Sequence, residues 1–329
     1  MNTDSKDNNS NPSGKRKLLI TGGSGTVGMA FMQQYRDEFE FYNISRNETY
    51  IAELERVLPN TTSFVADITD ADRLNNIFLK VRPDIVIHAA ALKHVNLAEL
   101  HPSKTVEVNI LGSLNVIKAC IRAEVPIAIA ISTDKACQPE NIYGYSKKIT
   151  EQLFMEHYNE KTKFSCARFS NVAGSNGSVI PFWIKSARDN ERLKLTDARM
   201  NRLMFTVQEA AQLIRQTIEY TEQSKEAFVL SRIMKSVNMR ELANVISRQF
   251  GNRSEPEIVG LRPGERLNET LVSQVELANA YFTHDGKHIA LHTNAFGEKR
   301  VTQELSSLTA EYMDESEIQQ LFEEEPAAS

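Results

Sequence analysis

The sequence predicts an α/β protein with a doubly wound parallel sheet and a smaller C-terminal domain. Three observations predict it. Short apolar runs alternate with helical stretches from residue 17 to about residue 170, a glycine-rich turn closes the first run, and polar motifs follow several later runs. Strands that alternate with helices form a parallel sheet, with the helices packed on both of its faces. The helical connections between parallel strands are right-handed, which makes the sheet doubly wound.

Each expected strand is a short apolar run bounded by turn or polar residues, as is typical of strands buried on both faces. These runs are residues 17–20, 39–44, 63–66, 84–87, 127–131 and 164–168. Helices are expected between them at residues 27–35, 71–81, 106–122 and 141–158. In the second of these helices, Leu74, Ile77 and Phe78 fall on one face.

After about residue 170 the alternation loosens, and the expected helices at residues 207–220 and 239–250 are separated by irregular stretches. We therefore expect a second domain and two polar ends. Residues 16–170, joined by 205–235, form the sheet domain; residues 171–204 and 236–321 form the smaller domain; residues 1–15 are a flexible leader and residues 322–329 an acidic tail.

Composition and charge exclude several classes of protein. Lys and Arg number 38 against 43 Asp and Glu, and a net charge of −5 argues against nucleic-acid binding, which favours a basic surface. No apolar run approaches the roughly 18 residues of a membrane span, and the polar first residues are not a signal peptide. The three cysteines and seven histidines show neither disulfide nor metal-ligand spacing, so no metal is expected. Free thiols favour a reducing cytoplasm.

A glycine-rich turn between the first strand and the first helix has glycines at three-residue intervals. Glycine permits a tight turn and the close approach of a pyrophosphate, and the following helix N-terminus supplies N–H groups and a positive dipole. A glycine turn without a ligand is the alternative, but the position after the first strand favours a Rossmann dinucleotide site. The expected contacts of this loop are Gly22, Ser24, Gly25, Thr26, Val27 and Gly28.

The second strand ends in Ser45 and Arg46, where NAD sites usually place an acidic residue. An arginine accommodates a 2′-phosphate instead, so the sequence predicts NADP in preference to NAD, unless Arg46 is an ordinary surface residue. Asp67 and Ile68, just past the third strand, are expected beside the adenine. Small residues past the fourth strand would let the cofactor lie against the backbone; these are Ala89, Ala90 and Ala91.

The motif STDK (residues 132–135) follows the fifth strand, at the edge where doubly wound folds bind ligands. The next helix carries Tyr143 and Lys147, which are four residues apart and so neighbours on one helical face. A lysine cation and a positive nicotinamide beside a tyrosine favour the phenolate, which can take a proton from a hydroxyl group. Tyr145 has Ile149 at the same spacing and lacks this partner. A solvated helix face is the alternative interpretation of the pair.

Together these motifs resemble the extended short-chain dehydrogenase/reductases and, more narrowly, the UDP-N-acetylglucosamine 4,6-dehydratases of surface-glycan pathways. The resemblance runs from residue 17 to about residue 270. It rests on the segments TGGSGTVG, SRNE, HAAALKHV, STDKACQPENIYGYSKK, FSNVAGSNGSVIPF, LTDARMNRL and LRPGERLNE.

The resemblance implies a reaction that begins at C4 of the sugar. Tyr143, helped by Thr133 and Lys147, would deprotonate the C4 hydroxyl while NADP takes the C4 hydride. Lys135 would then remove the C5 proton, Asp134 would protonate the departing C6 hydroxyl, and the hydride would return to C6. Lys135 has to be neutral for this role, and we expect desolvation to lower its pKa. The roles of Asp134 and Lys135 could be exchanged or shared, or the two could form only a salt bridge.

The resemblance also implies the contacts of a UDP-sugar. Arg202 and Arg262 suit a diphosphate because guanidinium groups pair with phosphate oxygens. The Glu265 carboxylate suits ribose hydroxyls. Lys93 would contact the sugar or the nicotinamide ribose. The implied substrate residues are Lys93, Thr133, Asn171, Val179, Pro181, Phe182, Thr196, Arg202, Arg262 and Glu265, with Lys93 shared with the cofactor. The chain departs from the family pattern at Ser170, Asn201, Leu203 and Asn268, which leaves the sugar open.

Two other functions stay open. A UDP-hexose 4-epimerase shares the fold and the C4 oxidation but needs no acid and base for loss of water, so Asp134 and Lys135 argue against it. A non-catalytic NADP-binding regulator would typically lack Tyr143 or Lys147, and both are present.

Among dehydratases, the motifs are most similar to members that invert C5 on the way to nonulosonic acids. The helices expected at residues 106–122 and 141–158 resemble the pair through which extended members form dimers. We therefore expect a homo-oligomer that binds neither membrane nor nucleic acid.

Overall fold

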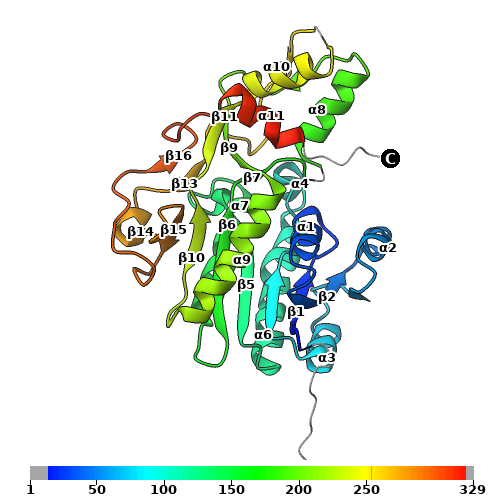
Figure 1. Ribbon diagram of the computed structural model, residues 1–329, viewed down its shortest axis with the longest axis vertical. Coiled ribbons are helices and arrows are strands. Elements are labelled where there is room, and N and C mark those ends of the chain that lie inside the picture. Colours follow the sequence, from blue (N-terminus) through cyan, green and yellow to red (C-terminus); the bar gives the residue numbers. More distant parts are fainter. Residues whose placement is uncertain (1–13, 176, 253, 324–329) are drawn as a thin grey trace, which may run out of the picture.

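The computed structural model describes residues 14–175, 177–252 and 254–323. The strands of its central sheet are β1 (Arg16–Thr21), β2 (Phe39–Ser45), β3 (Thr62–Val65), β4 (Ile85–His88), β5 (Ile127–Thr133), β6 (Lys163–Phe169), β10 (Val229–Arg232), β14 (Ala280–Phe282) and β15 (His288–Leu291). Their order is β14-β15-β10-β6-β5-β4-β1-β2-β3 (Figure 1). The strands from β10 to β3 run parallel, and β15 is antiparallel to both of its neighbours.

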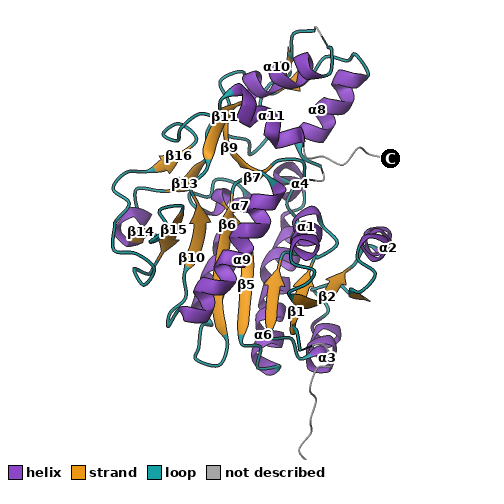
Figure 2. Ribbon diagram, in the orientation of Figure 1, coloured by secondary structure: helices purple, strands orange, loops and turns teal. Residues whose placement is uncertain are grey.

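Helices cover both faces of this sheet. On one face, α1 (Thr26–Gln34) packs against α9 (Val207–Gln223). On the other, α6 (Ser113–Arg122) packs against α3 (Ala71–Val81) and α7 (Ile142–Glu156). Figure 2 shows α9 in front of the strands and α6 behind them. The predicted fold class, a doubly wound and mostly parallel sheet, is confirmed.

The helix expected over residues 106–122 begins as a π-helix, Val106–Gly112, before it continues as α6. A Cβ at Gly112 would lie 2.8 Å from the Ile68 side chain, so the glycine lets this wide turn approach the core. Three further helices lie outside the expected ranges, and these are α2 (Glu48–Val57), α4 (Val95–Leu100) and α5 (Pro102–Thr105).

A second, smaller core lies beyond the carboxyl ends of the parallel strands, at the top of Figure 1. Its elements are β7 (Asn171–Val172), α8 (Val179–Arg188), β8 (Lys194–Leu195), β9 (Asn201–Phe205), β11 (Lys235–Asn238), α10 (Met239–Gln249), β12 (Glu257–Ile258) and α11 (Glu315–Glu323). Its apolar side chains come from three stretches of chain, residues 173–204, 237–246 and 318–322. A further pair of strands, β13 (Thr270–Val272) and β16 (Leu305–Ser306), lies between the two cores.

Two expected boundaries need correction. The sequence predicts residues 236–321 in the smaller domain, but β14 and β15 lie in the central sheet because β15 pairs with β10. Phe322, expected in the acidic tail at residues 322–329, is 4% exposed and packs in the second core. Residues 1–13 of the expected leader and residues 324–329 lie outside the described residues. Within the described part of the chain, no helix is both long and apolar enough to span a membrane.

Candidate active site

The glycine-rich turn after β1 forms a cradle that side chains would fill. Gly22 has a φ of +76°, and a Cβ there would lie 2.9 Å from the backbone of Ala90. A Cβ on Gly28 would lie 2.6 Å from Gly23, so α1 can begin close against the turn. Gly25 is the N-cap of α1, whose first N–H groups lie at this turn. The cradle fits the pyrophosphate of a dinucleotide.

A cation lies at the end of β2, where a 2′-phosphate would bind. Arg46 Nη1 is 3.5 Å from Asp67 Oδ2, and the Arg46 side chain is 55% exposed. Burial favours a raised pKa for Asp67, but hydrogen bonds from Thr69 and the charge of Arg46 lower it. These contacts favour the carboxylate form of Asp67.

The remaining residues expected at the cofactor surround the same turn. Ser24 Oγ donates to Ser45 Oγ at 2.8 Å, which ties the turn to β2. Ile68 is 4% exposed and packs in the main core. The others open α1 or follow β4, and these are Thr26, Val27, Ala89 and Ala91.

Tyr143 and Lys147 lie on the first turns of α7, whose N-cap is Asn141. Lys147 is 4% exposed, and burial lowers its pKa to about 8. Burial raises the pKa of Tyr143 to about 12, although Lys135 and a hydrogen bond with Thr133 act in the opposite direction. Because burial outweighs the nearby cations, the expected phenolate is not favoured by the protein alone. Tyr143 needs a further positive charge beside it to ionise near neutral pH.

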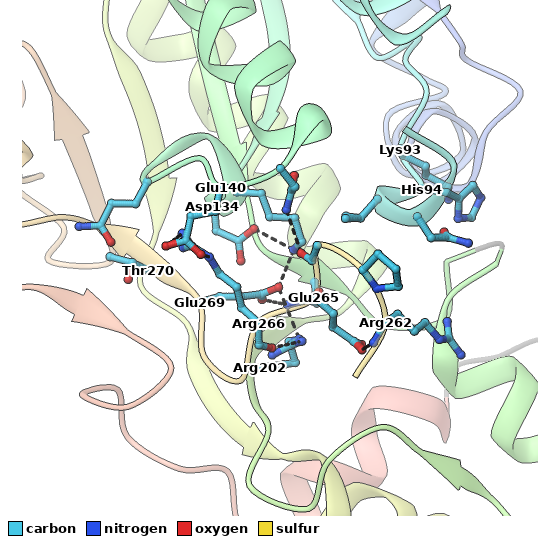
Figure 3. A pocket seen from close by; sticks show the side chains of 18 of the residues that line it. Lys93, His94, Asp134, Glu140, Arg202, Arg262, Glu265, Arg266, Glu269 and Thr270 are labelled. Atoms are coloured by element: carbon cyan, nitrogen blue, oxygen red, sulfur yellow. Dashed lines mark hydrogen bonds and ion pairs between the residues drawn. The ribbon is translucent and has the colours of Figure 1, made fainter. Parts of the chain in front are cut away.

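Three ionisable side chains meet where β5 ends. Asp134 and Lys135 open a short 3-10 helix there. Lys135 Nζ lies 3.1 Å from Asp134 Oδ1 and 2.7 Å from Oε1 of Glu269, which comes from the residue before β13 (Figure 3). Glu269 is also 3.4 Å from Arg202 Nε on β9, and it accepts a hydrogen bond from Asn171 Nδ2 at 2.6 Å. A carboxyl, an ammonium group and a second carboxyl thus form one connected cluster.

The groups of this cluster shift one another's pKa. Burial and the neighbouring Glu269 raise the pKa of Asp134. Burial alone would lower the pKa of Lys135, but its two carboxyl partners raise it. Burial would raise the pKa of Glu269, but Arg202 and Lys135 lower it. The cluster favours a protonated Asp134, a Lys135 cation and a Glu269 carboxylate, which corrects the expectation that desolvation makes Lys135 neutral.

The cluster lines a cavity of about 290 Å³ (Figure 3). The predicted residues found in its lining are Lys93, Asp134, Lys135, Asn171, Arg202, Arg262 and Glu265. Thr133, Tyr143 and Lys147 are not in the lining, although Tyr143 is close enough to feel the charges of Asp134 and Lys135.

Besides Thr133, four predicted substrate residues are not brought to this cavity. Val179, Pro181 and Phe182 form the first turn of α8, which packs on the second core and leaves Phe182 52% exposed. Thr196 is buried, and its hydroxyl donates to the sulfur of Met200 at 3.7 Å.

The two predicted arginines differ in their surroundings. Arg202 is 7% exposed, and its Nη atoms donate to backbone carbonyl oxygens at 2.8–3.2 Å while Nε faces Glu269. Arg262 is exposed, and its backbone N–H donates to Glu265 Oε2 at 3.0 Å. The Arg262 guanidinium is therefore the better placed of the two to meet an anion in the cavity.

The loop that carries Arg262 is tied to the start of α7. Asn141 Nδ2 donates to the carbonyl oxygen of Gly264 at 3.1 Å, and Asn141 Oδ1 accepts from the Gly144 N–H at 2.8 Å. Gly264 has a φ of +75°, and a Cβ there would lie 2.9 Å from Val95. These contacts fix the position of the loop over the cavity relative to the helix that carries Tyr143.

Arg168 on β6 is fully buried between two glutamates. It donates to both carboxylate oxygens of Glu151 at 2.8 and 2.9 Å and to both of Glu276 at 2.9 and 3.0 Å. It also donates to the carbonyl oxygen of Leu271 at 2.9 Å. Lys148 lies 3.5 Å from Glu276 and 3.8 Å from Glu151. These contacts join β6, α7 and the segment after β13, and so anchor the stretch that begins with Glu269.

The sequence does not single out Glu269 or the Arg168 cluster, because their partners lie far apart along the chain. A signal for Glu269 exists, since it is the last residue of the motif LRPGERLNE. One departure from the family pattern contacts the Asp134–Lys135–Glu269 cluster, and two others contact each other. Ser170 Oγ donates to Asp134 Oδ2, and Asn201 Nδ2 donates to Asn268 Oδ1 at 3.0 Å.

A family model described as polysaccharide biosynthesis protein matches residues 18–291. A UDP-N-acetylglucosamine 4,6-dehydratase (inverting) from Campylobacter jejuni is 34% identical over 79% of this chain and 78% of the relative. A UDP-glucose 4-epimerase from Rickettsia bellii is 32% identical over 80% of each chain. The solved structure of Pen from Bacillus thuringiensis has a TM-score of 0.85 and is 28% identical, covering 93% of this chain and 96% of its own. Some epimerase and dehydratase structures with the same fold are complexes with NAD.

Proposed function

The chain belongs to the family of polysaccharide biosynthesis proteins, and from that premise we propose that it removes water from a UDP-N-acetylhexosamine. The proposed substrate is UDP-N-acetylglucosamine, and the proposed product is a 4-keto-6-deoxy sugar for a surface glycan or a nonulosonic acid. The observation that carries the proposal is the Asp134–Lys135–Glu269 cluster in the cavity at the end of β5. Loss of water needs an acid at the C6 hydroxyl and a base at C5, and this cluster brings two carboxyl groups and a lysine together for these roles.

We propose NADP as the cofactor, because the cradle at Gly22 fits a pyrophosphate and Arg46 offers a cation for a 2′-phosphate. When bound, NADP would accept a hydride from C4 and return it to C6. Tyr143 is the group that takes the C4 hydroxyl proton, with Thr133 hydrogen-bonded to it and Lys147 on the next turn. Lys147 is 4% exposed and is shielded from bulk water, whereas Tyr143 is half-buried.

The elimination falls to the cluster. The raised pKa of Asp134 favours its protonated form, which supports its role as the acid that protonates the departing C6 hydroxyl. Lys135 is the group proposed to take the C5 proton, and its ammonium group has to lose a proton before it can act as this base. Inversion at C5 is the proposed outcome, because the Campylobacter relative is named as inverting.

A UDP-hexose 4-epimerase is the second candidate, and the Rickettsia relative carries that name. An epimerase would use Tyr143 and the cofactor for oxidation at C4, but it would have no catalytic role for Asp134 and Lys135. A non-catalytic regulator is the third candidate, and the presence of both Tyr143 and Lys147 argues against it.

Incubation with UDP-N-acetylglucosamine and NADP in D2O tests the proposal. We expect loss of water by mass spectrometry, a C6 methyl group and deuterium at C5 by proton NMR, and ring couplings that report the C5 configuration. Conversion to a C4 epimer without loss of water would support the epimerase. Binding without turnover would support the regulator.

We also propose that the chain acts as a homo-oligomer through α6 and α7. Apolar side chains on these helices and on the adjoining π-helix are 40–52% exposed, namely Leu111, Ile121, Tyr145 and Ile149. Sedimentation equilibrium with an Ile149→Glu variant tests this, and an unchanged mass for the variant would argue against that face. The three cysteines are free and buried, which supports a reducing cytoplasm as the proposed location.

A further inference from the structure

We propose that Ser170 is a positioning residue for Asp134, whose hydroxyl group holds the Asp134 carboxyl and stabilises the carboxylate that remains after the C6 hydroxyl has taken its proton. This inference rests on the dehydration proposed above, in which Asp134 is the acid. Ser170 is one of the positions at which the chain departs from the family pattern. The contact is therefore expected to set this chain apart from other members.

The register of the central sheet brings the two residues together. β5 and β6 are parallel neighbours, and Thr133 is paired with Phe169 where these strands end. Asp134 and Ser170 are the next residues along each strand, so both lie at the same edge of the sheet. Ser170 is 8% exposed, and it lies outside the lining of the cavity. It can therefore act on the reaction through Asp134.

The two oxygens of the Asp134 carboxyl have different partners. Oδ1 accepts from Thr133 Oγ1 at 2.8 Å and from Lys135 Nζ at 3.1 Å. Oδ2 accepts a hydrogen bond from Ser170 Oγ. Ser170 Oγ itself accepts from Asn171 Nδ2 at 3.2 Å, which leaves its own proton to point at Asp134. Ser170 thus holds the oxygen that is not shared with Thr133 and Lys135.

This contact matters because the acid changes its charge during the elimination. As the C5 proton leaves to the base, the C5–H electron pair becomes the C5–C6 double bond. The C6–O bond breaks as the proton passes from Asp134 to the leaving oxygen, which departs as water, and the negative charge stays on Asp134. A hydroxyl group can pair with a carboxyl or a carboxylate, but its hydrogen bond to the carboxylate is the stronger one. Ser170 should therefore make Asp134 a stronger acid.

The proposal predicts how the rate of water loss depends on pH. The charged and titratable groups that face Asp134 are Lys135, Glu269, Tyr143 and, across Glu269, Arg202. Burial and Glu269 raise the pKa of Asp134, whereas Lys135 and the Ser170 hydrogen bond lower it. Water loss needs the protonated acid, so its rate falls as the pH rises through this pKa. Without the Ser170 hydroxyl the pKa is higher, and the fall should come at a higher pH.

Single turnovers of Ser170→Ala with UDP-N-acetylglucosamine and NADP over a range of pH test the inference. Quenched mass spectrometry follows loss of water, and absorbance of reduced nicotinamide follows C4 oxidation. We expect water loss to slow by about tenfold at neutral pH, with its alkaline limb moved to higher pH, and C4 oxidation to stay near the wild-type rate. The KM for the sugar should not change, because Ser170 does not line the cavity.

Two further variants separate the hydrogen bond from a general effect on the fold. Ser170→Thr keeps a hydroxyl group and should keep the wild-type alkaline limb. Ser165→Ala is the matched control, because it removes another buried hydroxyl of β6, which is paired with Thr221 on α9. Its profile should match the wild type.

Infrared titration measures the same shift without turnover. The C=O stretch of protonated Asp134 is identified by its loss in Asp134→Asn. In Ser170→Ala this band should disappear at a higher pH than in the wild type.

An alkaline limb and an infrared midpoint at the wild-type pH in Ser170→Ala would overturn the inference. A profile that is scaled down without displacement would also overturn it, as would equal slowing of C4 oxidation and water loss, because both indicate a structural role. A wild-type enzyme that loses no water from the sugar would instead refute the proposed function. The infrared titration would still decide whether Ser170 acts on Asp134.

Discussion

Replacing Arg168 with methionine should destabilise the fold strongly, because it leaves two buried carboxylates without their partner. Glu151 is 0% exposed and the Glu276 side chain 9% exposed, and each loses a two-point pairing with the guanidinium. Removal of one partner from a buried ion pair typically costs about 3–5 kcal/mol. Lys148, at 3.5 and 3.8 Å, offsets part of the loss, so we expect about 3 kcal/mol.

Urea unfolding followed by circular dichroism measures this cost. The control is Lys161→Met, which removes an exposed pair with Glu124 at 3.0 Å and should cost below about 1 kcal/mol. A triple variant with methionine at positions 151, 168 and 276 removes the charges together and should recover most of the loss. The reasoning fails if Arg168→Met costs no more than the control, or if the triple variant is as unstable as Arg168→Met.

Three further predictions concern the cofactor cradle and the buried charges. Gly22→Ala should weaken dinucleotide binding by about tenfold or more and destabilise by about 1–2 kcal/mol, because its Cβ would meet Ala90 at a φ of +76°; Gly251→Ala, with a φ of +75° and open space, is the calorimetric control. Arg46→Ala should reduce NADP affinity by about tenfold and leave NAD affinity unchanged in titration calorimetry, and equal losses for both would refute the 2′-phosphate assignment. Burial would raise the pKa of Glu276, but Arg168 outweighs burial and lowers this pKa from the ordinary value of 4.5 to about 2. The Glu276 carboxylate therefore stabilises the fold fully above pH 4.5, and this stabilisation is lost as the pH falls from 4.5 toward about 2. Glu276→Gln should flatten this part of the curve of urea midpoint against pH, and an unchanged slope would contradict the assignment.

The main sheet and the helix with Tyr143 could be predicted because their signals are local. Apolar runs such as residues 127–131 coincide with strands since a parallel strand is buried on both faces. Asp134 and Lys135 could be predicted at the site because they follow such a strand, and the carboxyl ends of parallel strands share one edge.

The rest depended on distant contacts and on burial. Glu269 reaches Lys135 from the far part of the chain, and Arg168 meets Glu276 only after the segment beyond β13 folds back on β6. The pKa values of Tyr143 and Lys135 are both raised, whereas the sequence predicts lowered values for both. Their values follow from how deeply each group is buried and which carboxyl groups face it, and neither is visible in residue spacing.

The second core has a consequence for how this architecture can change. Its three stretches, residues 173–204, 237–246 and 318–322, alternate along the chain with α9, which packs on the central sheet, and with β10, β14 and β15 of that sheet. The second core is not one continuous segment, so no single cut in the chain separates it from the central sheet. Recombination at one junction therefore cannot transfer the whole second core between relatives. Sugar preference in such an architecture should diverge by point substitution around the cavity, and laboratory libraries should target positions such as Ser170, Asn201 and Asn268 in preference to grafted modules.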